Sequence, residues 1–148
     1  MLYQSLSSGA ELWRRYASSS ASIRYKLPAN VAINGMSALL ETKNGFVGAN
    51  PYAHEAARML VEEAIVAANA CGCTLEHGAE PAHAFEVARM TDKTISSMVQ
   101  DVTHHREPEI RIITGAVCRL GWEHHVPTPC NDLLLQLVLA KQSIYLGR

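Results

Sequence analysis

The sequence predicts an all-α, helical bundle-like domain, and three observations support this fold class. Apolar residues recur at helical spacing along most of the 148 residues. No stretch alternates convincingly between apolar and polar residues at the period of a strand. The apolar segments are separated by short connections, and no repeat of fixed period links them. Regularly spaced helices with short connections are typical of a helical bundle.

The first part of the chain holds one short and one long helical segment. Residues 9–18 are compatible with a helix, and the serine-rich residues 18–22 read as a turn or linker. A long helix is expected over residues 27–41, because Pro28 suits the first turn of a helix. Asn44-Gly45 then marks the turn that follows it.

Five further helices follow at similar intervals. They are expected over residues 52–71 before Gly72, over residues 79–90, from Ser96 or Ser97, from Pro108 to Gly121, and from Thr128-Pro129 onward. The last of them is apolar on nearly every side, since Leu133 to Leu139 includes only one polar residue, Gln136. A helix of this kind needs burial all round, so we expect the domain to self-associate, most simply as a homodimer.

The composition excludes several classes of protein. Hydrophobic residues make up 48% of the chain and charged residues 18%, which argues against disorder. A formal net charge of −1 argues against nucleic acid or anionic membranes as partners. No run approaches the ~20 apolar residues of a membrane helix, and the first residues do not resemble a secretory signal. We therefore expect a soluble, cytoplasmic protein.

The cysteines and histidines do not form a recognisable metal site. Cys71-Gly72-Cys73 is a C-x-C pattern and not the C-x-x-C of zinc or thioredoxin-type sites. We expect all four cysteines to be reduced thiols that behave as small apolar residues. The doublets His104-His105 and His124-His125 diverge by about 100° on a helix and cannot easily share a metal ion.

Three polar residues form a stripe on the long helix. Lys26, Asn30 and Asn34 are spaced four residues apart, so they line one edge of a helix over about 12 Å. Asparagine is a poor helix former, and apolar residues lie between the members of the stripe. One interpretation is a solvated helix face. The other is a binding site, in which an ammonium and two amides hold the oxygens of a small molecule.

A second polar segment begins at Ser97. The run Ser97-Met98-Val99-Gln100 has the pattern of a capping box, and a helix N-terminus can also receive a carboxylate. Asp101 and Arg106 are expected to form an ion pair that shapes the following loop. Glu109 follows Pro108 at a helix start, where the helix dipole favours an acid.

Together these segments resemble the C-terminal, substrate-binding half of the ketopantoate reductase (2-dehydropantoate 2-reductase) family. The resemblance covers the chain from about Lys26 to its end, although Pro108 and Arg111 stand where the family usually has threonine and aspartate. It implies a fold of the 6-phosphogluconate dehydrogenase C-terminal type. It also implies a set of site roles: Lys26 as the catalytic proton donor, Asn30, Asn34, Asn44 and Ser97 as substrate ligands, and Glu109 as an active-site residue near the lysine and the cofactor.

The implied chemistry explains the residue types. Hydride delivered to a 2-keto carbon leaves a developing alkoxide, which an ammonium can stabilise and protonate. Such general acid assistance is typically worth ~10²–10⁴-fold in rate.

The sequence lacks the G-x-G-x-x-G turn and βαβ unit of a nucleotide-binding domain. We therefore expect residues 1–25 to form an N-terminal helix and linker, and residues 26–148 to form the reductase-like domain. NADP is expected only with a nucleotide-binding domain supplied in cis or in trans, and none is expected on this chain alone.

The leading hypothesis is the substrate-binding domain of an NADPH-dependent reductase of 2-keto acids, with ketopantoate the favoured substrate in pantothenate biosynthesis. The alternative is a non-enzymatic helical dimerisation or interaction module that retains the reductase fold. A third interpretation is a related 2-hydroxy acid dehydrogenase domain with different substrate contacts.

Overall fold

The computed structural model describes residues 11, 13–15 and 26–148 of the chain. Residues 26–148 form helices joined by short loops and contain no strand. In chain order the helices are α3 (Lys26–Leu40), α4 (Asn44–Ala49), α5 (Pro51–Ala70), α6 (Ala79–Met90), α7 (Ser97–Thr103), α8 (Ile110–Glu123) and α9 (Pro129–Leu146). The expected all-α fold class is confirmed.

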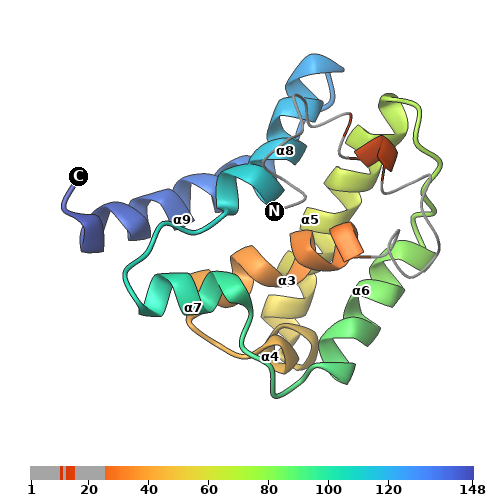
Figure 1. Ribbon diagram of the computed structural model, residues 1–148. Coiled ribbons are helices and arrows are strands. Elements are labelled where there is room, and N and C mark those ends of the chain that lie inside the picture. The colour runs from red at the N-terminus through yellow and green to blue at the C-terminus, as the bar shows by residue number, and fades with distance from the viewer. Residues whose placement is uncertain (1–10, 12, 16–25) are drawn as a thin grey trace.

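Helix α3 lies at the centre of the arrangement. Figure 1 shows α5 crossing it, α6 to its right, α4 and α7 below it, and α8 and α9 above it. Every one of these six helices contacts α3. Its apolar residues are correspondingly buried, with Leu27, Val31, Ala32 and Ala38 inaccessible to solvent. The stripe expected from sequence therefore lies on the most enclosed helix of the described chain.

The helix ends follow local capping signals. Asn50 begins α5, and its Oδ1 accepts hydrogen bonds from the backbone N–H groups of Tyr52 at 3.1 Å and Ala53 at 3.0 Å. Pro51 occupies the first turn, where its missing N–H costs nothing. Gly147 ends α9 in the left-handed conformation, with φ of 68°.

The N-terminus of α9 is capped by a distant acid. Thr128 precedes this helix but makes no capping hydrogen bond with its side chain. Instead, the half-buried Glu63 of α5 accepts hydrogen bonds from the backbone N–H groups of Cys130 at 2.8 Å and Asn131 at 2.9 Å. The Asn131 amide Nδ2 also donates to Glu63, at 2.8 Å, and to the Leu60 carbonyl, at 3.0 Å. One carboxylate thus joins α5 to the start of α9.

Two of the expected boundaries are wrong. Asn44-Gly45, interpreted as a turn, instead begins the short helix α4, which packs against α6. Gly121, interpreted as the end of a helix, lies inside α8. A Cβ atom at Gly121 would come within 2.6 Å of the Val126 carbonyl oxygen and 2.7 Å of Thr128 Cγ2. This glycine therefore lets the returning loop approach the helix, and it does not mark a helix stop.

Most of the N-terminal segment lies outside the described residues. Glu11 and residues 13–15 are helical, in agreement with the expected helix over residues 9–18, whereas the serine-rich residues 18–22 are not described. Trp13 is 1% exposed and belongs to the hydrophobic core. This short element therefore contributes to the same core as α3 to α9.

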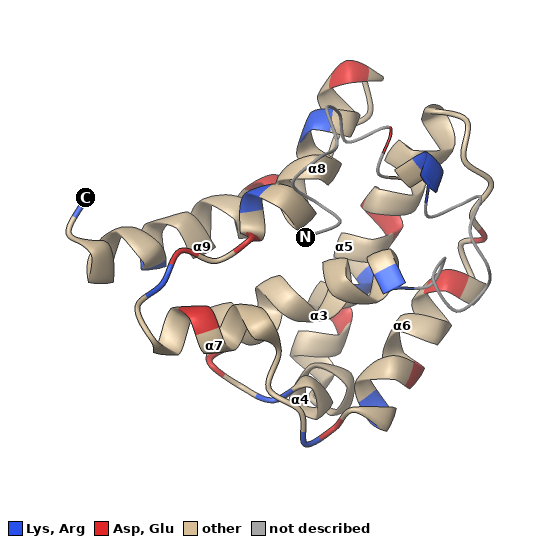
Figure 2. Cartoon of the chain, viewed as in Figure 1, with Lys and Arg blue, Asp and Glu red and all other residues tan. Residues whose placement is uncertain are grey.

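Positive and negative residues are interspersed along the helices and loops of the described chain (Figure 2). No helix among the described residues is both long and apolar enough to cross a membrane. In the same part of the chain, no three histidine, cysteine or acidic side chains gather closely enough to hold a metal ion.

Candidate functional site

The Lys-Asn-Asn stripe occupies one edge of α3. Lys26 is the first residue of the helix and is exposed, while Asn30 and Asn34 are half-buried. Among the described residues, the Lys26 ammonium forms no ion pair. The stripe therefore runs from a solvated cation to two partly enclosed amides.

The N-terminus of α7 packs against the end of this stripe. Ser37, one turn beyond Asn34, donates a hydrogen bond from Oγ to the Asn34 carbonyl at 3.2 Å. Its Oγ also lies 3.1 Å from Ser96 Oγ, and Ser96 in turn accepts from the Val99 N–H at 3.2 Å. With the Ser37 proton directed to the Asn34 carbonyl, the Ser96 hydroxyl can donate to Ser37. This line of hydrogen bonds fixes the start of α7 beside Asn34.

Ser97 does not cap α7, contrary to the capping-box expectation. The capping side chain belongs to Ser96, which is buried, and Gln100 Nε2 reaches the Ile95 carbonyl at 3.4 Å. Ser97 is the first residue of the helix, and its side chain is exposed. Its hydroxyl is therefore not needed for the cap. Sequence reasoning missed Ser37, although it continues the stripe at helical spacing, and it gave the capping role of Ser96 to Ser97.

Glu109 lies at the start of α8, near the later part of α3. Its backbone carbonyl accepts the N–H groups of Ile112 and Ile113, and its exposed carboxylate makes no capping hydrogen bond. The next residue, Ile110, meets α3 at Gly35, where an added Cβ would lie 3.2 Å from Ile110 Cδ1. Gly35 is about 13 Å along the helix axis from Lys26. The fold thus brings Glu109 toward the Asn34 end of the stripe, and no ion pair joins it to Lys26.

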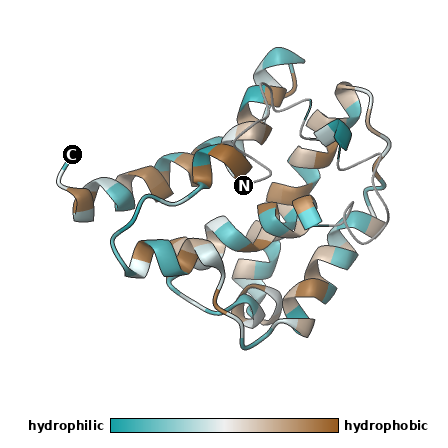
Figure 3. Ribbon diagram, in the orientation of Figure 1, coloured by the Kyte–Doolittle hydropathy of each residue, from teal (hydrophilic) through white to brown (hydrophobic). Residues whose placement is uncertain are grey.

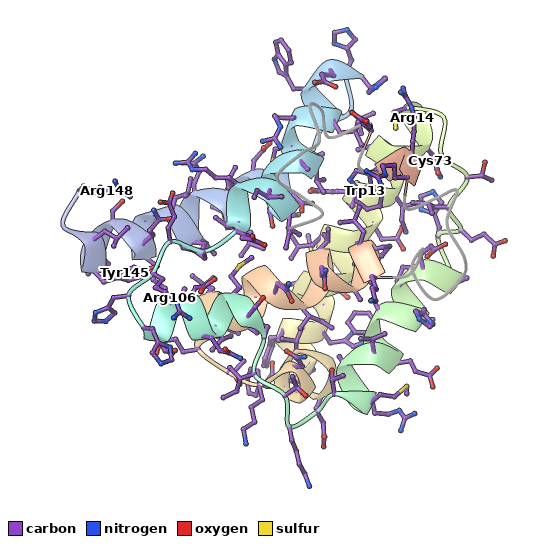
Figure 4. The ribbon with its side chains drawn as sticks, in the orientation of Figure 1. Trp13, Arg14, Cys73, Arg106, Tyr145 and Arg148 are labelled. Carbon is purple, nitrogen blue, oxygen red and sulfur yellow. The ribbon has the colours of Figure 1, made fainter. Side chains whose placement is uncertain are left out.

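The loop that precedes Glu109 is held by the end of α9. Tyr145 donates its hydroxyl to the Arg106 carbonyl at 2.7 Å, and its ring stacks on His105 with centroids 5.2 Å apart. Figure 4 shows Tyr145 and Arg106 together at this edge of the molecule. Burial, reinforced by the nearby carboxylates of Asp101 and Glu107, raises the pKa of Tyr145, so its phenol remains a donor.

Two ion pairs add to this clamp. Arg106 Nε lies 3.1 Å from Asp101 Oδ1, which confirms the expected ion pair that shapes the loop. Arg148 Nη2 lies 3.3 Å from Glu107 Oε2. Both pairs are largely exposed and contribute little to stability, so they mainly fix the path of the loop.

Asn44 lies away from the start of the stripe. It begins α4, is 8% exposed, and donates from Nδ2 to Thr91 Oγ1 at 3.1 Å. Its backbone N–H donates to the Thr94 carbonyl at 3.0 Å. The Asn44 Oδ1 is buried without a hydrogen-bond partner among the described residues. Asn44 thus connects α4 to the end of α6 and the loop after it, while its Oδ1 accepts no hydrogen bond from the described residues.

Comparison with known proteins identifies this arrangement. Residues 20–142 match the family model described as ketopantoate reductase PanE/ApbA C terminal. The chain belongs to the ketopantoate reductase family. A 2-dehydropantoate 2-reductase of Pyrobaculum aerophilum is 35% identical over 119 residues, which are 80% of this chain and 42% of that protein. The chain is therefore a C-terminal domain of this reductase family and spans about two-fifths of the length of that relative.

Solved structures share the fold. D-mandelate dehydrogenase in a ternary structure with NADH and anilino(oxo)acetate matches with a TM-score of 0.78 and 30% identity, over 84% of this chain and 69% of that one. A dimeric ketopantoate reductase from Staphylococcus aureus matches with a TM-score of 0.74 and 26% identity, over 84% of this chain and 43% of that one. These structural neighbours agree with the family assignment.

Proposed function

We propose that this chain is the substrate-binding domain of an NADPH-dependent reductase of 2-keto acids, with ketopantoate as the favoured substrate and pantoate as the product. The observation that carries the proposal is the position of the stripe: Lys26, Asn30 and Asn34 share one edge of α3, and α7 is fixed beside its end. The relatives named 2-dehydropantoate 2-reductase support the choice of substrate.

In this proposal each polar side chain has a separate task. Lys26 stabilises and protonates the alkoxide that forms when hydride reaches the keto carbon. Asn30 and Asn34 hold the substrate oxygens by their amides, and the exposed Ser97 hydroxyl adds a contact at the N-terminus of α7. Asn44 is assigned a further substrate contact on the resemblance alone, because its side chain is buried and already donates to Thr91.

The cofactor would be held mainly by a second domain. NADPH, when bound, supplies the hydride. Glu109 is the residue of this chain that we assign to the cofactor side, because its carboxylate is exposed at the start of α8 and is not used for capping. The same proposal includes three further points. The reductase-like domain spans residues 26–148, the nucleotide-binding domain is supplied in cis or in trans, and the protein is cytoplasmic.

A fusion protein tests this function. A nucleotide-binding domain from a family reductase is joined ahead of residue 26, and NADPH oxidation is followed with ketopantoate. We expect turnover in the fusion and none in the isolated chain. Lys26→Met should lower kcat by ~10²–10⁴-fold. Lys93→Met is the matched control, because Lys93 is exposed in the loop after α6 and should leave kcat unchanged. A folded fusion that binds NADPH but reduces no 2-keto acid would refute the proposal.

The interaction module remains a second candidate because α9 exposes apolar side chains. Leu133 is 60% exposed, Leu137 43% and Ile144 84%, and Figure 3 shows hydrophobic segments along α9. An apolar groove of about 260 Å³ adjoins them, lined in part by Met36, Leu39, Met59, Leu60, Leu133 and Leu137. We propose that a second copy of the chain covers this face.

Light scattering over a concentration series tests the dimer. The expected result is twice the mass of one chain, reduced to a single mass by Leu137→Glu. Gln136→Glu on the neighbouring exposed position of α9 is the control and should leave the dimer intact. A single-chain mass at high micromolar concentration of the unaltered protein would contradict the proposal. Dimerisation together with an inactive fusion would favour the non-enzymatic module.

A further inference from the structure

Two cysteines lie in contact at the end of α5, outside the candidate site. Cys71 follows the last residue of the helix and Gly72 has φ of +96°. The N–H groups of Cys71 and Cys73 both donate to the Ala68 carbonyl at 3.1 Å. This tight turn places the two Sγ atoms 3.8 Å apart, with one thiol hydrogen-bonded to the other.

The surroundings hold this turn on both sides. Asn69 donates from Nδ2 to the Leu75 carbonyl at 3.0 Å and accepts from the Leu75 N–H at 2.9 Å, which fixes the chain as it leaves the turn. Arg14 Nε donates to the Cys71 carbonyl at 3.4 Å, and Figure 4 shows Arg14 beside Cys73. The sulfur atoms are therefore kept close together by contacts from three parts of the chain.

We propose that Cys71 and Cys73 form a reversible dithiol site that is oxidised to an intrachain disulfide by a low-molecular-weight disulfide such as oxidised glutathione. One cysteine thiolate attacks the small disulfide, which forms a mixed disulfide and releases one reduced thiol. The second cysteine then attacks the mixed disulfide, which forms the Cys71–Cys73 bond and releases a second reduced thiol. The protein loses two electrons and two protons, and the small disulfide gains both.

The geometry favours this pair over the other cysteines. The sulfur separation must shorten from 3.8 Å to about 2.05 Å to form the bond. Gly72 between the two cysteines adopts φ of +96°, which glycine does without steric cost, so the turn that brings the sulfur atoms together is unstrained. Cys118 and Cys130 face carboxylates instead, since their thiols interact with Asp132 and Glu63 respectively. Within the described residues, Cys71 and Cys73 are the cysteines whose sulfur atoms are in hydrogen-bond contact with each other.

The same surroundings set the rate and the reversibility. Burial, and secondarily the neighbouring Cys71, raises the pKa of Cys73 to about 12, so its thiol is protonated at neutral pH. The exchange should therefore be slow at neutral pH and faster in alkaline buffer. A disulfide across one intervening residue closes a small ring, and strained disulfides are readily reduced. The site should reopen when reduced glutathione is in excess.

Thiol trapping of the native chain tests this proposal. The protein is equilibrated with oxidised glutathione, remaining thiols are alkylated, and the products are mapped by peptide mass spectrometry. We expect Cys71 and Cys73 to lose alkylation together, with a Cys71–Cys73 disulfide in one peptide and full recovery on adding reduced glutathione. Cys71→Ser and Cys73→Ser should each stop at one glutathione adduct on the remaining partner. The double variant Cys118→Ser/Cys130→Ser should close the disulfide as the unaltered chain does.

Three outcomes would overturn the proposal. The first is full alkylation of Cys71 and Cys73 after oxidation. The second is a separate glutathione adduct on each of these residues, and the third is a disulfide from either of them to Cys118 or Cys130. Circular dichroism of each variant, before and after oxidation, ensures that the native helices are present when the thiols are trapped.

Discussion

Removing the charge from Glu63 gives the sharpest test of how the domain is held together. Its carboxylate accepts three hydrogen bonds at the start of α9, from the N–H groups of Cys130 and Asn131 and from Asn131 Nδ2. Glu63→Gln keeps the size of the side chain, but one of its two oxygens becomes an NH₂ group. That group faces a donor and can no longer accept, so at least one N–H of α9 loses its partner.

The expected cost follows from these contacts. A hydrogen bond to a charged acceptor contributes about 1.5–3 kcal/mol. A negative charge at a helix N-terminus adds a further ~0.3–1 kcal/mol. We therefore expect Glu63→Gln to lower the free energy of unfolding by about 2–4 kcal/mol. For a chain of this size, each kcal/mol lowers Tm by roughly 2–4 °C.

Urea denaturation followed by circular dichroism measures this loss. The adjacent residue gives a matched control: Glu62 pairs with His77 at 2.7 Å, but the His77 side chain is 56% exposed. Glu62→Gln should therefore cost less than about 1 kcal/mol. Equal losses for the two variants would refute the argument, because they would show that the cap of α9 contributes no more than a surface ion pair.

Three further predictions concern other parts of the fold. Gly45→Ala should lower the free energy of unfolding by about 1–3 kcal/mol, because a Cβ there would lie 2.8 Å from the backbone of the loop after α6. Gly48→Ala in the same helix is the control: its Cβ would lie 3.4 Å from the nearest atom, so the change should be neutral or stabilising. Tyr145→Phe should cost about 0.5–1.5 kcal/mol and speed amide hydrogen exchange in the loop around Arg106, and unchanged exchange would contradict the clamp. Burial, and secondarily the hydrogen bond that the thiol donates to the Asp132 carboxylate, raises the pKa of Cys118 from 9.0 to about 12. The stability contributed by this thiol should therefore be complete below pH 9 and lost as the pH rises through 12, and Cys118→Ser should flatten that part of the pH profile.

The helices could be predicted from sequence where their signals are local. Pro28, Pro51 and Pro129 each stand in the first turn of a long helix. Apolar residues at helical spacing then continue nearly to the observed end of each of these helices. The failures have tertiary causes. Gly121 is needed for a loop that returns against its own helix, and α4 forms because its first residues are held by the loop after α6.

The candidate site shows the same division. The stripe from Lys26 to Asn34 depends only on helical periodicity, and the structure places it on one edge of α3 as expected. The choice between Ser96 and Ser97 as the cap depends on which of them has an extended backbone conformation. Two adjacent serines in the sequence do not distinguish these possibilities. The hold of Tyr145 on Arg106 joins residues 39 positions apart, so no local pattern could indicate it.

The central position of α3 limits how this domain can respond to a ligand. The helix that carries the stripe is in contact with each of α4 to α9, and Gly35 lets Leu134 and Ile110 approach its backbone closely. A well-packed interior transmits a displacement to its neighbours instead of absorbing it. A shift of α3 would thus require all six surrounding helices to repack. If the domain binds a small molecule as proposed above, we expect closure to come from rigid rotation of the whole domain, with the exposed Lys26 side chain adjusting to it.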